Sequence, residues 1–434
     1  MSLSLSPGPE AVLPPDNTYA IQAGGELFRL SGFSLNSDAP SYFTAHFSRD
    51  PSATLILDRC PSVFRLIVQH LQGYAVNVDD ETQFTALFSD ALYFSLPRLQ
   101  TLLRTSDYHY TCVGGVHFKL PKHLVSEPGN TPNYFDVTSG SVFQDLERVF
   151  RSKNLARPPP LSPPYVSRSP EYFAQLISLL QGGALDLAPC ARRSLILECR
   201  YYRFLRLEQQ LVPCRLSWNP FSRTPEVFLD LVDVKSAGVS LPDHPLSVAA
   251  TPAEPVAKKP RTAFTTVQYK RPFIDAESPS RDLKFQMDFP HEATVFYAGD
   301  SKEFYVSLSA QLLEKFCFVF RKFLSQLGID IARFMRRTSS ESSVLVFPAE
   351  LTDCHLEVNK LPCKDLVSLL ETPHAAERRP GHGSYSTSLV PAQSIQLVKS
   401  IWQLAIRGET VLMVASKIDA VSSIKCLNAD LEFL

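Results

Sequence analysis

The sequence predicts an α+β protein in which two similar modules of mixed α/β structure precede a β-rich C-terminal domain. Two observations carry this prediction: a set of segments that occurs twice in the first half of the chain, and short runs of alternating apolar and polar residues in the second half. The chain has 434 residues, which exceeds the ~250–300 residues at which single hydrophobic cores stop growing. We therefore expect a disordered N-terminal segment at 1–17, modules at 18–108 and 109–215, and a C-terminal domain at 216–434.

The first repeated segment contains two adjacent glycines. Residues 22–31 and 112–121 have the same Gly-Gly pair, followed by Phe and Leu at the same spacing. Alternating apolar residues flank the glycines, which can supply the positive φ values of a tight turn. Each copy is therefore predicted to be a β-hairpin. A second pair of similar segments follows in the same order, at residues 38–43 and 130–135.

The third repeated segment predicts helices. Residues 59–74 correspond to residues 168–183, and in the first copy Pro61 opens a helix that Gly73 ends. Further helices are predicted to begin near Asp80 and at Leu96, and the second copy repeats this ending at 201–207. A proline-rich insertion between residues 139 and 164 makes the second copy longer, and surface loops tolerate such insertions at little cost.

These segments resemble the BTB/POZ domain of the potassium-channel-tetramerisation type. The resemblance rests on Gly24 and Gly25 with residues 28–30, on residues 38–47 and 58–64, and on the helical segments at 71–74 and 90–94. The doubled arrangement is similar to fungal BTB growth-regulation proteins, which are related to the yeast stress-response phosphatase activator. The resemblance covers residues 18–215, and beyond Leu216 it rests on residues 230–240 and 267–275. The second copy departs from the pattern through its long loop and through Gly183, where the first copy has Tyr74.

The resemblance implies a scaffold that self-associates and recruits other proteins. We expect a non-enzymatic adaptor whose partners are proteins, among them a second copy of the chain and a protein phosphatase. Its output would be regulation of growth and stress response through restraint of target-of-rapamycin signalling. Two alternatives stay open: a substrate adaptor of a cullin ubiquitin ligase, and an enzyme located in residues 217–434.

Aromatic and charged residues of the first module are candidates for its assembly or partner surface. They mix these two residue classes as protein interfaces do, and the charged ones would form polar contacts between subunits. The simpler alternatives are burial of the aromatic residues in the core, and a local salt bridge or helix cap for the charged ones. The candidates are Asp38, Tyr42, Phe47, Asp58, Arg59 and Arg98.

In the C-terminal domain, alternating runs at 226–232, 283–289 and 411–415 predict strands. Apolar residues at helical spacing between Leu308 and Leu327 predict one long amphipathic helix, whose apolar stripe we assign to the core. Residues 241–266 and 371–388 are rich in loop-forming residues and are predicted to be flexible.

The sequence lacks the common signatures of catalysis and of metal or cofactor binding. It contains no phosphate-binding loop, dinucleotide fingerprint, nucleophile elbow, His-Glu-x-x-His or Cys-x-x-Cys motif. We therefore expect no catalytic residue, no cofactor and no metal. Arg336 and Arg337 precede Ser339 as a basophilic kinase would require, which makes Ser339 a candidate phosphorylation site.

Charge and apolar patterning limit the partners and the compartment. The formal net charge of -1 provides no overall attraction to nucleic acid, and no stretch approaches the ~18 apolar residues of a membrane span. We expect no nucleic-acid partner, no direct membrane insertion and no secretory signal. Nine scattered cysteines favour a reducing compartment, so the expected localisation is the cytoplasm. The basic run at residues 257–261 adds the nucleus as a second location.

Overall fold

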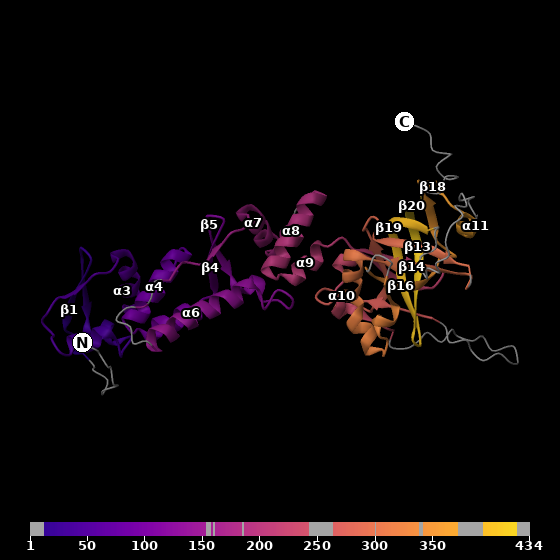
Figure 1. Cartoon of the computed structure of the whole chain (residues 1–434). Coiled ribbons are helices and arrows are strands. Elements are labelled where there is room, and N and C mark those ends of the chain that lie inside the picture. Colours follow the sequence, from indigo (N-terminus) through magenta and orange to yellow (C-terminus); the bar gives the residue numbers. More distant parts are fainter. Residues whose placement is uncertain are drawn as a thin grey trace, which may run out of the picture. The chain divides into compact units, whose positions relative to one another are not determined.

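The chain forms two compact units, residues 1–211 and 212–434 (Figure 1). The structure is a computed structural model that describes residues 13–152, 158, 161–184, 186–242, 264–299, 301–337, 342–371 and 394–422. It is a mixed α+β fold in which the second unit is rich in strands. The division falls between Leu211 and Val212, close to the expected boundary at 215, and it keeps both repeated segments in one unit. In the described residues, no helix is long and apolar enough to span a membrane.

The first half of unit 1 contains the expected hairpin. Its strands β1 (Thr18–Ala23) and β2 (Glu26–Ser31) are antiparallel, and β3 (Leu55–Leu57) pairs with β1 in parallel. Three predicted helices are confirmed: one starts at Pro61, one is capped by Asp80, and one starts at Pro97. The helices are α1 (Gly32–Asn36), α2 (Tyr42–Phe47), α3 (Pro61–Leu71), α4 (Glu81–Tyr93) and α5 (Pro97–Arg104).

Residues just before the first strand belong to the folded structure. Leu13 is buried, and its main-chain N–H donates to Oδ1 of Asn36 at 3.0 Å. The side-chain amide of Asn36 in turn donates to the carbonyl of Leu13 at 2.8 Å. The expected disordered segment at 1–17 is therefore ordered from residue 13, because a buried leucine and two hydrogen bonds hold it. Residues 1–12 lie outside the described residues.

The second half of unit 1 repeats the sheet of the first. The strand order β5-β4-β6 matches the order β2-β1-β3, with the same antiparallel hairpin and the same parallel third strand. The insertion expected to be a proline-rich loop after residue 139 is partly helical, because α6 continues to Ser152. The elements are β4 (Tyr108–Val113), β5 (Val116–Pro121), η1 (Lys122–Val125), α6 (Tyr134–Ser152), β6 (Tyr165–Val166), α7 (Pro170–Leu180), α8 (Pro189–Tyr202) and α9 (Leu205–Leu211).

Unit 2 is built on one set of strands whose pairings close on themselves. Pairings run from β16 to β14, β13, β19 and β20, and β20 pairs again with β16, so these five strands form a circuit. The strands are β7 (Arg215–Asn219), β8 (Thr224–Asp230), β9 (Val239–Ser240), β10 (Thr265–Thr266), β11 (Gln268–Tyr269), β12 (Arg281–Met287), β13 (Ala293–Ala298), β14 (Glu303–Leu308), β15 (Met335–Arg337), β16 (Ser343–Glu350), β17 (His355–Val358), β18 (Leu361–Pro362), β19 (Ser394–Arg407) and β20 (Thr410–Val421).

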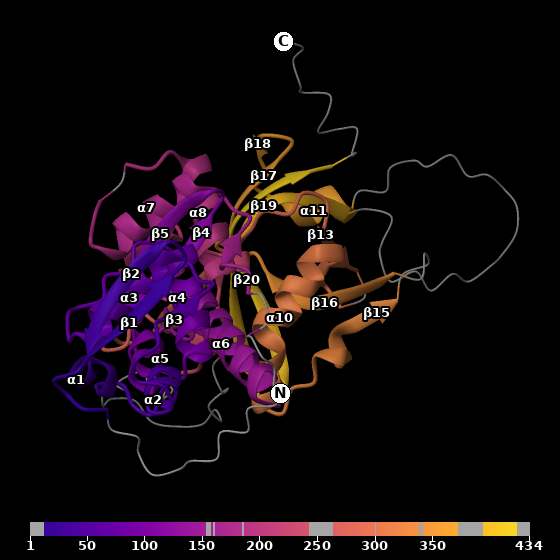
Figure 2. The same ribbon diagram turned by 90° about the vertical axis from the view of Figure 1, so that its left-hand side faces the viewer.

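One long helix, α10 (Ala310–Gln326), packs against this sheet beside β16 (Figure 2). Its Phe316 and Phe320 lie 5.1 Å and 5.5 Å, between ring centroids, from Phe347 and Phe285 of the strands. The predicted helix and the core position of its apolar stripe are therefore confirmed. The remaining short helices are η2 (Leu231–Asp233), η3 (Ser236–Gly238), η4 (Ile331–Phe334) and α11 (Leu366–Glu371).

Two segments of unit 2 were expected to be flexible. Most of each, at 243–263 and 372–393, lies outside the described residues. The end of the first segment is not a loop, because Thr265 pairs with Ile406 of β19 and Thr266 pairs with Ala405. The threonines are β-branched and join the sheet through main-chain hydrogen bonds that the local composition does not reveal.

The turn of the first hairpin provides a matched test of this geometry. Gly24 has a φ of +57°, and an added Cβ would lie 3.1 Å from Cγ of Pro61, whereas a Cβ on Gly25 would meet nothing within 4 Å. We expect Gly24→Ala to lower the free energy of unfolding by about 2 kcal/mol, because alanine disfavours this backbone conformation and the contact is tight. We expect Gly25→Ala to be neutral or slightly stabilising. Equilibrium urea unfolding of the two variants checks this, and equal losses would contradict it.

Candidate functional site

Asp38 lies inside the protein at the N-terminus of α5. Its Oδ1 accepts from the main-chain N–H of Arg98 at 2.7 Å, and its Oδ2 accepts from that of Leu99 at 3.0 Å. Oδ2 is also 2.8 Å from Nε2 of His70. Burial acts to raise the pKa of Asp38, but the hydrogen bonds from His70 and the two N–H groups outweigh it, so the pKa is lowered. Asp38 is thus a buried helix cap and not part of an exposed partner surface.

The other predicted surface residues divide between the interior and the surface. Phe47 is fully buried against Tyr19, at 4.8 Å between ring centroids, so it belongs to the core. Asp58 and Arg98 are exposed, and Nη1 of Arg98 donates to the carbonyl of Ser37 at 2.6 Å. Only part of the predicted set is therefore available to a partner in this conformation.

Arg59 and Tyr42 belong to a partly exposed polar and aromatic cluster. Nη1 of Arg59 lies 3.1 Å from Oδ1 of Asp90, and its guanidinium carbon lies 4.0 Å above the ring of Tyr93. Tyr42 lies 6.1 Å from Tyr93 between ring centroids. Burial raises the pKa of Asp90, and the charge of Arg59 opposes this effect. The arginine is held by an ion pair and by a cation–π contact, in a form suited to structural support.

The second half contains the same cluster at equivalent positions. Arg168 makes two contacts with Glu198, through Nη2 at 2.8 Å and Nε at 3.1 Å, and its guanidinium carbon lies 4.6 Å above Tyr201. Tyr134 stacks on Tyr201 at 5.4 Å. The sequence repeat aligns Arg59 with Arg168 and Tyr42 with Tyr134. It does not reveal the carboxylates that pair with the two arginines, because one copy uses an aspartate and the other a glutamate.

The start of the first half's α4 and the residues before it cover part of the outer face of the second sheet. Nζ of Lys119 donates to Oδ1 of Asn77 at 3.1 Å and to the carbonyl of Val78 at 3.0 Å. The rings of Phe84 and Tyr110 stack at 4.9 Å between centroids. These contacts join residues far apart in the sequence, and they make the two halves of unit 1 one packed body.

The outer face of the first sheet carries exposed apolar side chains. Leu27 and Ile56 both pair with Gln22 of the central strand, and they are 52% and 74% exposed. Two large apolar side chains thus project from the same face of the two edge strands, on either side of the central strand β1. The corresponding row on the second sheet is His117, Cys112 and Tyr165, and there His117 contacts Glu81 of the first half.

A pocket of about 340 Å³ lies between the two halves of unit 1. Phe84 and Arg104 of the first half line it together with His109, Lys122 and Asp136 of the second. It therefore combines an apolar wall with charged groups of both signs, as binding pockets do.

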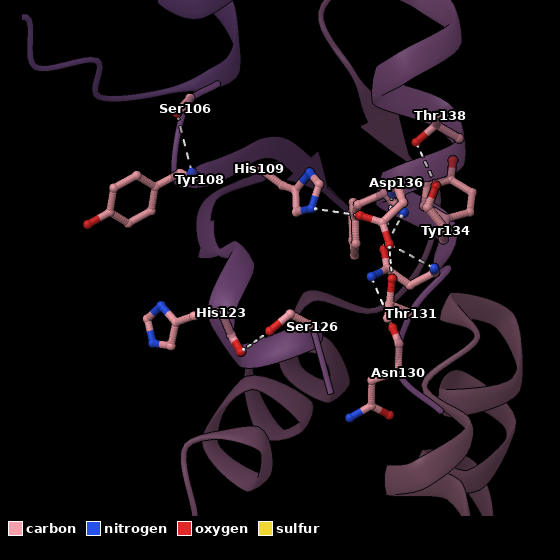
Figure 3. Close-up of polar contacts among 12 residues, drawn as sticks. Ser106, Tyr108, His109, His123, Ser126, Asn130, Thr131, Tyr134, Asp136 and Thr138 are labelled. Atoms are coloured by element: carbon pink, nitrogen blue, oxygen red, sulfur yellow. Dashed lines mark hydrogen bonds and ion pairs between the residues drawn. The ribbon is translucent and has the colours of Figure 1, made fainter. Parts of the chain in front are cut away.

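Figure 3 shows how Asp136 is held at this pocket. Its Oδ2 accepts from Oγ1 of Thr131 and from the main-chain N–H of Asn133, both at 3.0 Å. The side chain of Asn133 accepts in return from the N–H of Asp136 at 3.1 Å, which completes a capping box at the start of α6. His109 approaches the other oxygen of Asp136 with a long contact of 3.4 Å (Figure 3). The carboxylate is thus occupied by structural partners.

The pKa of His109 is lowered to about 4. Burial is the largest cause, and the charge of Lys122 adds to it, while Asp136 acts in the opposite direction. His109 is therefore neutral near pH 7 and packs as an aromatic ring, 5.7 Å from Phe135 between centroids.

Unit 2 exposes apolar residues at its first strand. Leu216 and Trp218 are both exposed, and they alternate with Ser217 on β7 so that they share one face of the strand. The candidate phosphorylation site Ser339 lies outside the described residues. Its two preceding arginines are exposed at the end of β15.

Comparison with known proteins identifies the class of this chain. Residues 224–431 match the family described as the YLR108C C-terminal domain. The uncharacterized protein YDR132C of Saccharomyces cerevisiae is 33% identical over 98% of this chain and 96% of its own length. The BTB/POZ domain-containing protein YLR108C of the same yeast is 34% identical with the same coverage. These matches define a BTB/POZ-related protein of fungal type. The chain belongs to the family of YLR108C and YDR132C.

The buried neutral His109 predicts a specific acid sensitivity. Its pKa is about 4 when folded and 6.5 in the unfolded reference, so the unfolded chain binds the extra proton first as the pH falls. The neutral His109 side chain makes its full contribution to the free energy of unfolding above pH 6.5. As the pH falls from 6.5 to 4, this free energy decreases by up to about 3 kcal/mol. We expect His109→Phe to flatten this part of the profile of unfolding free energy against pH. The exposed His123→Phe serves as control, and an unchanged slope in His109→Phe would exclude this origin.

Proposed function

We propose that the protein is a non-enzymatic adaptor whose unit 1 consists of two tandem BTB/POZ modules that bind other proteins. The family relationship supports the BTB/POZ assignment. The matching sheet order in the two halves supports the tandem arrangement, as does the recurrence of the Arg59–Asp90–Tyr93 cluster in the second half. BTB/POZ domains generally act by protein–protein contact, so a scaffold follows from this architecture.

The set of exposed apolar side chains on the outer face of the first sheet is the observation that carries this proposal. The equivalent face of the second sheet is already a protein contact surface, since Lys119 and Tyr110 on it meet Asn77 and Phe84 of the first half. The outer face of the second sheet thus binds the N-terminal part of α4 and the residues just before it. We infer that the outer face of the first sheet can bind the start of an equivalent helix. The first sheet has the same strand order and presents Leu27 and Ile56 where the second sheet has His117 and Tyr165.

The partner that we propose for this face is a second copy of the chain. The second half offers α8, which corresponds to α4 in chain order and in its Arg–carboxylate–Tyr cluster. Residues 186–193, at and before the start of α8, are exposed or half-buried. The copies would then associate head to tail, with the first sheet of one against the α8 region of the next. Such heterologous contacts extend an arrangement that the chain already uses internally.

The absence of an enzymatic role is part of the proposal. Two titratable groups of the pocket in unit 1 have structural partners: Asp136 completes a capping box, and His109 packs against Phe135. Helix capping and aromatic packing explain both residues without a reaction.

The more specific part of the proposal, which concerns the partner and the cellular effect, rests on the resemblance of the sequence to fungal BTB growth-regulation proteins. In this hypothesis the recruited partner is a protein phosphatase, and the effect is restrained target-of-rapamycin signalling and promotion of the stress response. The cytoplasm, with the nucleus as second location, is the compartment in which these partners would be met. Enrichment of phosphatase activity with the purified chain tests this part, and enrichment of a cullin instead would favour the ubiquitin-ligase alternative.

Head-to-tail association predicts a concentration-dependent mass for the full chain. We expect Leu27→Asp with Ile56→Asp to weaken self-association at least about tenfold, because each buried aliphatic side chain contributes about 1.5–3 kcal/mol. Tyr74→Asp is the matched control, since Tyr74 is 69% exposed and lies outside the sheet. Light scattering over a dilution series measures the effect. A strict monomer, or an oligomer that the double change leaves intact, would exclude this face as the contact.

A further inference from the structure

Three side chains of different chemistry converge where the two halves of unit 1 meet. Nδ1 of His117 lies 2.9 Å and 3.1 Å from the two carboxylate oxygens of Glu81. Cys112 is directly opposite His117 in the register of the β4–β5 hairpin. One ligand atom from each of Glu81, Cys112 and His117 lies within 4.8 Å of the other two. We propose that these three side chains form a binding site for a divalent metal ion of the zinc class.

The donor set fits this class of metal. Zinc binds thiolate sulfur, imidazole nitrogen and carboxylate oxygen in a tetrahedral arrangement, with bonds of about 2.0–2.3 Å. Such bond lengths place the ligand atoms about 3.5 Å from one another. Nδ1 of His117 would therefore move slightly away from the Glu81 oxygen at 2.9 Å, and the Cys112 sulfur would come within about 3.5 Å of both. The fourth position would hold a water molecule. Calcium and magnesium prefer oxygen ligands alone, so the sulfur and nitrogen disfavour them.

The surroundings allow the required movement and leave the ligands accessible to the ion. The side chain of His117 is 58% exposed, so its ring can turn, whereas that of Glu81 is 3% exposed and fixed at the start of α4. Lys119 projects from the same face of β5 as His117, but its Nζ donates to Asn77 and Val78. The nearby positive charge is thus directed to other acceptors. Metal binding would release the Cys112 thiol proton, since only the thiolate is a ligand.

The arrangement would make the ion a bridge between the two halves. Glu81 belongs to the first half, and Cys112 and His117 belong to the second. The corresponding positions on the first sheet hold Gln22 and Leu27, which lack this donor set. The site therefore arises only where one half meets the other, and it does not depend on the proposed adaptor role or on self-association.

The simpler explanation of this cluster is a hydrogen-bonded Glu81–His117 pair beside an inert thiol. The two explanations differ in one respect that can be measured, because only the metal site requires the sulfur. Cobalt(II) is a suitable probe, since a thiolate ligand gives it an intense near-ultraviolet charge-transfer absorption and tetrahedral coordination gives it strong visible bands.

The test uses the full-length protein, stripped of metal with a chelator and titrated with cobalt(II) and then with zinc. We expect one cobalt per chain with a thiolate absorption, displacement of the cobalt by zinc, and a rise in the thermal midpoint with added zinc. Cys112→Ser should abolish the charge-transfer absorption, and His117→Ala should weaken zinc binding by at least about tenfold. Circular dichroism establishes that each variant is folded.

Matched controls separate this site from other thiols and imidazoles. Cys190→Ser removes another cysteine, which is exposed, and His123→Ala removes another exposed histidine. Both should bind cobalt as the unaltered chain does. Absence of a thiolate absorption in the unaltered protein would overturn the proposal. Binding that persists in Cys112→Ser, or that is lost in Cys190→Ser or His123→Ala, would overturn it equally.

Discussion

The organisation of unit 1 depends on how the first half covers the outer face of the second sheet. A stacked pair of rings, Phe84 on Tyr110, supplies the apolar part of that contact. Lys119 makes the contact specific, because its ammonium group donates to the side-chain amide of Asn77 and to the carbonyl of Val78. These two hydrogen bonds orient the first half relative to the second sheet. Arg104 of α5 also pairs with Glu147 of α6, which adds an ion pair between the two halves. The position of α6, of the pocket and of the metal-ligand cluster all follow from this one contact.

The sequence was most informative where backbone geometry restricts the choice of residue. Gly24 and Gly114 both adopt positive φ at hairpin turns, and Pro61 and Pro97 both begin helices, so local composition was enough to predict these elements. The repeat could be aligned for the same reason. The α6 helix was missed because its sequence continues into a proline-rich segment that dominates the composition of the insertion.

Side-chain roles were predicted less well than secondary structure. Asp38 has the charge and position of an interface residue, but its acceptors are filled by N–H groups sixty or more positions later, at Arg98 and Leu99. That contact depends on the fold and leaves no local signal. The repeat does contain an indirect sign, because Asn130 occupies the equivalent position and accepts from the N–H of Leu207. Likewise, Glu81, Cys112 and His117 have no recognisable spacing, since they meet only after the two halves pack.

The closed strand circuit of unit 2 determines which strands remain able to accept another strand. The long strands β19 and β20 have neighbours on both sides, so their main-chain groups are satisfied within the unit. The described path ends in β18 and β9, which are two residues each and too short to template further pairing. In the described residues β7 pairs with β8 alone, and it exposes Trp218 beside a free edge of five residues. Among the strands described in unit 2, β7 therefore offers the longest edge for intermolecular β-augmentation and for the aggregation that it can start.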